Sequence, residues 1–156
     1  MRSVYLEMAI QMGKMGNEAL WQTRRHSRQF LRGVTDFDED GNYAWKCGAF
    51  ASNSYRFSEM ANPHRDLKDY SRVLHGEHII PLKMVFERWL EMITKNSSEK
   101  DQYDFLDEHL EVIWITVEEQ QLLDRKLGLR TKMPDDWNWG DDPLARLHFA
   151  GIIVIE

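Results

Sequence analysis

The chain has 156 residues, of which 42% are hydrophobic and 29% are charged. This composition excludes a wholly disordered chain and a low-complexity fibre, and it suffices for one domain, which we expect to span residues 1–156. The net charge of −6 argues against a large non-specific nucleic-acid footprint, and the single cysteine, Cys47, excludes an internal disulfide framework. No apolar run approaches the roughly 20 residues of a membrane span, so we expect a cytoplasmic protein without membrane contact.

The first half of the chain predicts helices. Apolar residues at three-to-four spacing predict a long N-terminal helical segment over 3–32, as one helix or as two that meet near Gly13 and Gly16. Gly33 is expected to end this segment. The next expected elements are an acidic turn over 35–42, a helix from Trp45 or Ala49 to Met60, and a short helix with a turn over 67–74.

The second half predicts further helices and two strands. The expected elements are a helix from Pro81 to Lys95, a linker over 96–98, a helix over 101–110, a strand over 112–115, a helix that ends at Leu127 before Gly128, a loop over 129–143, a helix over 143–150 and a strand over 152–155. Thr116 and Glu119 fit a capping box at the start of the third of these helices. Segment 111–156 therefore reads strand-helix-loop-helix-strand, and we expect its two strands to pair with each other. The predicted fold class is α+β, predominantly helical, with a small two-stranded sheet near the C-terminus.

A cluster of polar residues within segment 75–95 is the first candidate site. His75, Glu77 and His78 lie within four positions, just before the helix that Pro81 begins. Two imidazoles and a carboxylate at this spacing can bind a divalent metal or supply a general base. The alternative is that Glu77 and His78 only cap the helix and favour its dipole.

The segment Glu77-His78-Ile79-Ile80-Pro81-Leu82 resembles the acid-His-Ile-x-Pro segment that opens the active site of HNH-type nucleases, the ββα-metal class. The resemblance implies that His78 is the general base that deprotonates an attacking water, and that Glu77 is a metal ligand. It also implies a middle asparagine, which Asn96 would supply by order, and a closing histidine on a helix.

The position of that closing histidine falls on residues 113–120, where Gln120 stands instead. Glu118 or Glu119 would then take its place, although capping also explains Glu119. The candidate catalytic residues are therefore His78 and Glu77, and the candidate ligands of Mg²⁺ or Zn²⁺ are His75, Glu77 and Glu118.

Basic residues at helical spacing are the candidate substrate contacts. Arg25, Arg28 and Arg32 share one helix face, where they would bind phosphates or pair with nearby acidic residues. Arg130 and Lys132 lie in the loop that also carries Trp137 and Trp139. These two tryptophans would form a recognition surface or close one edge of the core.

Residues 36–41 carry carboxylates at the first, third and fifth positions of a calcium-binding loop and a glycine at the sixth. The twelfth position, which needs a glutamate, is Cys47. Weak calcium binding and an acidic solvated turn both remain open.

Two functions follow from these patterns. The first is a small metal-dependent phosphodiesterase that acts on nucleic acid. The second is a non-catalytic acidic interaction protein that binds or inhibits a protein partner, since residues 81–156 carry 16 Asp and Glu against nine Lys and Arg.

Overall fold

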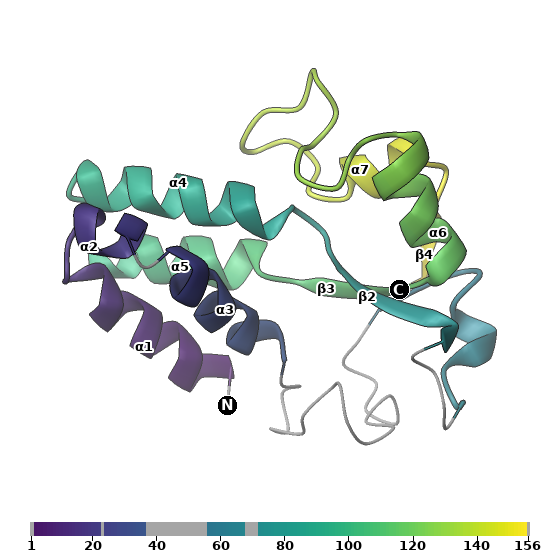
Figure 1. The fold of residues 1–156 in the computed structure, drawn as a ribbon, viewed down its shortest axis with the longest axis horizontal. Coiled ribbons are helices and arrows are strands. Elements are labelled where there is room, and N and C mark those ends of the chain that lie inside the picture. The colour runs from purple at the N-terminus through teal and green to yellow at the C-terminus, as the bar shows by residue number, and fades with distance from the viewer. Residues whose placement is uncertain (1, 23, 37–55, 68–71, 156) are drawn as a thin grey trace.

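The computed structural model describes residues 2–22, 24–36, 56–67 and 72–155 (Figure 1). In this part of the chain the helices are α1 (Arg2–Gly13), α2 (Asn17–Gln22), α3 (Arg24–Thr35), α4 (Leu82–Thr94), α5 (Glu99–His109), α6 (Val117–Gln121) and α7 (Ala145–Phe149). The strands are β1 (Phe57–Ser58), β2 (Leu74–His78), β3 (Val112–Thr116) and β4 (Val154–Ile155). A 3₁₀ turn, Asn62–His64, follows β1, and a π-helical turn, Leu122–Lys126, extends α6. The predicted α+β class with predominant helix is confirmed.

The described strands form one sheet in the order β2-β3-β1-β4. β2 and β3 are antiparallel, whereas β1 lies parallel to β3 and antiparallel to β4. The prediction of a two-stranded sheet is therefore wrong. Both expected C-terminal strands exist, but β1 lies between them, and two residues are too few for their pattern to reveal a strand.

The sheet lies between two groups of helices (Figure 1). Helices α1 to α5 pack at one end of the molecule, and α6, α7 and the long loop between them lie at the other. Ile113 and Ile115 of β3 belong to the main core, while Trp114, which points to the opposite face, packs with Phe57 and Leu74 in a second cluster. Burial on both faces explains why β3 is continuously apolar.

Local signals place most of the helix ends correctly. Pro81 immediately precedes α4, and Thr116 and Glu119 form the predicted capping box of α6. Gly128 and Gly151 adopt positive φ values of 67° and 72° after their helices, a backbone conformation that glycine adopts without strain. These boundaries need no tertiary information, because each depends on a few neighbouring residues.

The N-terminal segment departs from its prediction. Its described helical residues lie in α1, α2 and α3, and α1 ends at Gly13, where a break was expected. Gly33 does not end α3, which continues to Thr35. A Cβ atom on Gly33 would lie 2.4 Å from Cε1 of Tyr5, so this glycine permits the close approach of α1 and α3.

Several other predictions fall on undescribed residues. The helix that ends at Met60 lies mostly there, and its described part is wrong because Phe57–Ser58 is strand β1. The calcium-like loop also lies outside the described residues, except for Asp36. The helix over 67–74 lies partly outside them, and Leu74 begins strand β2, which was not predicted. Among the described helices, none has the length and apolar character needed to cross a membrane.

The contact between Gly33 and Tyr5 gives a test of the helix packing. We expect Gly33→Ala to lower the free energy of unfolding by about 1–3 kcal/mol, the usual cost of overpacking. In the Tyr5→Ala background the same change should raise it by up to about 1 kcal/mol, because alanine favours helix over glycine. Urea denaturation of the four proteins measures both effects, and the same cost in the two backgrounds would contradict the contact.

Candidate functional site

A cleft of about 560 Å³ runs along the outer edge of β2. β2 is an edge strand of the described sheet, so only β3 pairs with it and its other side is open. The cleft collects residues from four parts of the chain: α3 (Arg25, Arg28, Arg32 and the adjacent Asp36), β2 (His75 to His78), the start of α4 (Pro81, Leu82, Lys83) and the region of α6 with its following loop (Gln120, Asp124, Arg130, Thr131).

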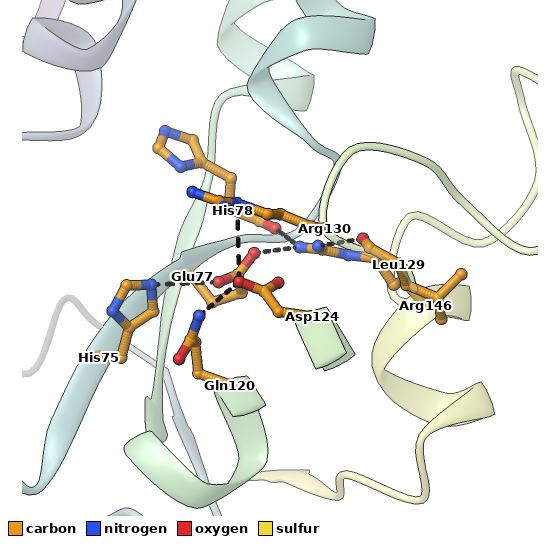
Figure 2. Close-up of polar contacts among 8 residues, drawn as sticks. All are labelled: His75, Glu77, His78, Gln120, Asp124, Leu129, Arg130 and Arg146. Atoms are coloured by element: carbon orange, nitrogen blue, oxygen red, sulfur yellow. Dashed lines mark hydrogen bonds and ion pairs between the residues drawn. The ribbon is translucent and has the colours of Figure 1, made fainter. Parts of the chain in front are cut away.

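Strand geometry separates the three polar side chains of β2. Side chains alternate along a strand, so His75 and Glu77 share one face and His78 lies on the other. The Nε2 atom of His75 is 3.2 Å from Oε2 of Glu77. Figure 2 shows these two side chains next to each other, with the ring of His78 turned away from them. The cleft includes all three because it extends around the strand edge.

Arg146 of α7 fixes this end of β2 from within the protein. Its side chain is fully buried, with an exposed fraction of 0%. One terminal nitrogen donates to the Leu129 carbonyl at 3.0 Å, and the other donates to Glu77 Oε1 at 2.6 Å and to the His78 carbonyl (Figure 2). Its Nε atom is buried and has no hydrogen-bond partner among the described residues. Arg146 was not among the predicted site residues, because nothing local in the sequence relates it to a strand 68 residues earlier in the chain.

These contacts keep Glu77 ionised. Burial raises the pKa of its carboxyl, but the hydrogen bond from His75 and the positive charge and hydrogen bond of Arg146 outweigh burial and bring the pKa below its ordinary value. At neutral pH, Glu77 is therefore a carboxylate with one oxygen on Arg146 and the other facing His75.

His78 is held as a neutral imidazole. Burial lowers its pKa to about 4, and the positive charges of Arg32 and Arg146 add to this effect, while the Glu77 carboxylate opposes it. Its Nε2 atom lies 3.4 Å from the hydroxyl oxygen of Thr35, the last residue of α3. A neutral imidazole beside a cleft can accept a proton, which an imidazolium cannot do.

The cleft is locally basic although the chain is acidic. Five cationic side chains (Arg25, Arg28, Arg32, Lys83 and Arg130) and three carboxylates (Asp36, Glu77 and Asp124) line it. The three arginines of α3 follow the three-to-four spacing that places them on one helix face. Such a concentration of cations suits a phosphate or another anion.

Gln120 and Asp124 form the wall opposite α3. Gln120 donates a hydrogen bond to Asp124, whose side chain is only 15% exposed and lies 3.8 Å from Nε of Arg130 (Figure 2). In the sequence, Gln120 was notable only because it stands where the resemblance places a histidine, and Asp124 was not predicted as a site residue. Their four-residue spacing, just before the basic loop, could have indicated that both side chains lie on one helix face near Arg130.

Two of the predicted site residues lie elsewhere. Glu118 is exposed on α6 and does not line the cleft, and Lys132 pairs instead with Asp135 at 2.9 Å. Glu119 accepts hydrogen bonds from Ser58 and from the Thr116 amide, so it is a buried structural residue. Within the described ranges, no group of three or more His, Cys, Asp or Glu side chains is arranged to hold a metal ion.

The two tryptophans of the long loop pack against the main core. Their rings lie 5.1 Å apart, and Trp139 also contacts the rings of Phe105 and His109. The Trp137 Nε1 atom donates to the Asp142 carbonyl. This arrangement corresponds to the structural alternative, in which they close one edge of the core.

No family model, no curated protein and no solved structure matches this chain.

Removal of the Arg146 charge should destabilise the protein. We expect Arg146→Met to lower the free energy of unfolding by about 3–5 kcal/mol, because it removes the cationic partner of the largely buried Glu77 carboxylate. Arg146→Met combined with Glu77→Gln should cost less than the sum of the two single changes. Denaturant unfolding measures these values, with Arg125→Met on the exposed side of the π-helical turn as the matched control. Additive costs would show that the ion pair is not the source of the stability.

The low pKa of His78 should make the free energy of unfolding of the metal-free protein depend on pH. The unfolded chain binds a proton at His78 near pH 6.5 and the folded chain only near pH 4. The free energy of unfolding should therefore fall as the pH decreases through this range, by up to about 1.4 kcal/mol per pH unit. His78→Gln should show a shallower decline in denaturant titrations with a chelator. Parallel profiles would contradict a neutral, buried His78.

Proposed function

We propose that this protein is a metal-dependent phosphodiesterase of HNH-like type that acts on nucleic acid. One observation carries the proposal: a neutral imidazole, an ionised carboxylate and five cationic side chains line the same cleft of an otherwise acidic chain. Phosphate binding needs the cations, and hydrolysis needs a group that takes a proton from water.

The order of elements around the cleft supports the resemblance to the ββα-metal class. β2 carries Glu77 and His78, pairs antiparallel with β3, and both strands contact α6. Along the chain, helices α4 and α5 separate the two strands, where the resemblance implies the middle asparagine. Asn96 lies in the turn between these helices and does not line the cleft, so we give it no role.

His78 would act as the general base. In the proposed reaction the unprotonated ring nitrogen of His78 takes a proton from a water molecule, and the water oxygen forms a bond to phosphorus. The bond from phosphorus to the leaving oxygen breaks, and that oxygen takes a proton from solvent. An approaching phosphate raises the pKa of His78, which brings it nearer to the range in which a base is effective.

The α3 arginines and the start of α4 would bind the phosphate. Arg28 and Arg32 line the cleft together with Lys83, the second residue of α4. The first amide groups of a helix carry no intrahelical partner, and Pro81 supplies no side-chain cap to α4. Arg25 and Arg130 would contact neighbouring phosphates of the chain.

His75 and Glu77 fit a divalent cation as a pair. Their facing atoms lie 3.2 Å apart on one side of β2, and Glu77 keeps its other oxygen on Arg146. Mg²⁺ commonly takes one or two protein ligands and completes its shell with water and phosphate oxygens. When bound, the metal would neutralise charge that develops on the phosphate. Glu118, the third ligand expected from the sequence, is no longer part of this proposal.

Cleavage assays test the catalytic part. Supercoiled plasmid DNA and a single-stranded RNA are incubated with the protein and Mg²⁺, Mn²⁺ or Zn²⁺. We expect metal-dependent cleavage that falls at least a hundredfold in His78→Ala, because general bases contribute at least about that factor. No cleavage of either substrate with any metal would refute the activity, and full cleavage by His78→Ala would refute the assigned base.

Binding assays test the cleft separately. Arg28→Ala should weaken the binding of a fluorescent DNA duplex and reduce the slope of log K against log salt by about one unit. Lys132→Ala is the matched control, since it removes a cation that lies outside the cleft. Equal effects of the two variants would mean that general charge, rather than this cleft, holds the nucleic acid.

A further inference from the structure

A second concave surface lies between α2 and α4, at the opposite end of α4 from the cleft. Its volume is about 820 Å³. From α4 it takes Glu87, Leu90, Glu91 and Thr94, which follow the spacing of a single helix face. Figure 1 shows α2 beside the C-terminal half of α4. We call this surface the α2–α4 groove.

The floor of the groove is apolar and one wall is aromatic. Leu90 is almost fully buried beneath it, and Trp21 of α2, a residue that is 48% exposed, contributes its indole ring. A tryptophan left this exposed costs free energy in water, and such side chains are common anchors of protein interfaces.

The rim of the groove is acidic. Three carboxylates, those of Glu18, Glu87 and Glu91, line it against one ammonium group, that of Lys95. Two of them have partners on α4: Arg88 lies 2.8 Å from Glu91, and Lys83 lies 3.7 Å from Glu87. Exposed pairs within one helix contribute only about 0.3–0.5 kcal/mol. An incoming cation can therefore replace them at little cost.

The location of the groove at the C-terminal end of α4 adds to its preference for cations. The C-terminal end of a helix carries a partial negative charge, and Thr94 and Lys95 of the groove lie at that end of α4. An indole ring also attracts a guanidinium or ammonium group placed over its face.

We propose that the α2–α4 groove binds an amphipathic helix of a partner protein that presents arginine or lysine beside apolar side chains. The apolar floor takes the apolar face of that helix, and the acidic rim and Trp21 take its cations. A groove between two helices with residues at helical spacing is the usual receptor for such a segment. This proposal does not rest on the catalytic one, because no residue of the groove lines the cleft.

The test uses two labelled peptides, one with leucine and arginine at helical spacing and one with glutamate in place of arginine. Fluorescence anisotropy should show that the arginine peptide binds and that its affinity falls with salt, whereas the glutamate peptide does not bind. Trp21→Ala, and Glu87→Gln combined with Glu91→Gln, should each weaken binding at least tenfold. Glu108→Gln, an exposed carboxylate on α5, should leave it unchanged.

Three results would overturn the proposal. The first is no binding of the arginine peptide to the wild-type protein, and the second is equal affinity of the groove variants and the Glu108→Gln control. The third is a dimer in light scattering that becomes a monomer in the groove variants, because a second copy of this chain would then be the occupant. Circular dichroism and DNA-duplex binding of each variant check that the fold and the cleft are intact.

Discussion

The geometry of the candidate site depends on one buried guanidinium. Arg146 has no exposed surface, and its hydrogen bonds join α7 to the Leu129 carbonyl and to both polar groups at the end of β2, the Glu77 carboxylate and the His78 carbonyl. Burial removes water from both ions, so the pair is favourable only while these contacts are complete. The strand end that carries His78 is consequently fixed by a helix almost seventy residues further along the chain.

The site also depends on the edge position of β2. An edge strand exposes unpaired backbone groups, and proteins usually protect such an edge with charges, loops or helices. Here α3 and the α6 region flank the edge, and their arginines, Gln120 and Asp124 line the space that remains. The edge is thereby protected from pairing with another strand while its side chains stay accessible to a ligand. In the proposed activity, His75 and Glu77 on one face of β2 and His78 on the other would act on the same molecule.

The sequence predicted features that neighbouring residues determine. The capping box of Thr116 and Glu119, the start of α4 after Pro81 and the glycines that follow α6 and α7 all depend on a few adjacent positions. Proximity in sequence placed His75, Glu77 and His78 at one strand edge, but it did not reveal that side-chain alternation turns His78 to the opposite face. The failures concern contacts between distant segments: β1 lies between β3 and β4, Gly33 packs on Tyr5, and Arg146 reaches Glu77. The prediction that Glu118 lies at the site is wrong for another reason. Neighbouring positions of a helix point in different directions, and Gln120 and Asp124 line the cleft instead.

Helix α4 connects two surfaces of opposite charge. Its first residues line the basic cleft and its last turns line the acidic groove, so each end of the helix dipole lies beside the ligand charge that it favours. A helix of 13 residues is about 20 Å long, which exceeds the screening length of about 8 Å at physiological salt. Charges at the two ends of α4 are therefore screened from each other, whereas Lys83 of the cleft and Glu87 of the groove form an ion pair at 3.7 Å in its first half. The net charge of −6 conceals both surfaces. The proposed protein partner in the groove would leave the cleft open to the proposed nucleic-acid substrate, so α4 would allow both to be bound at once.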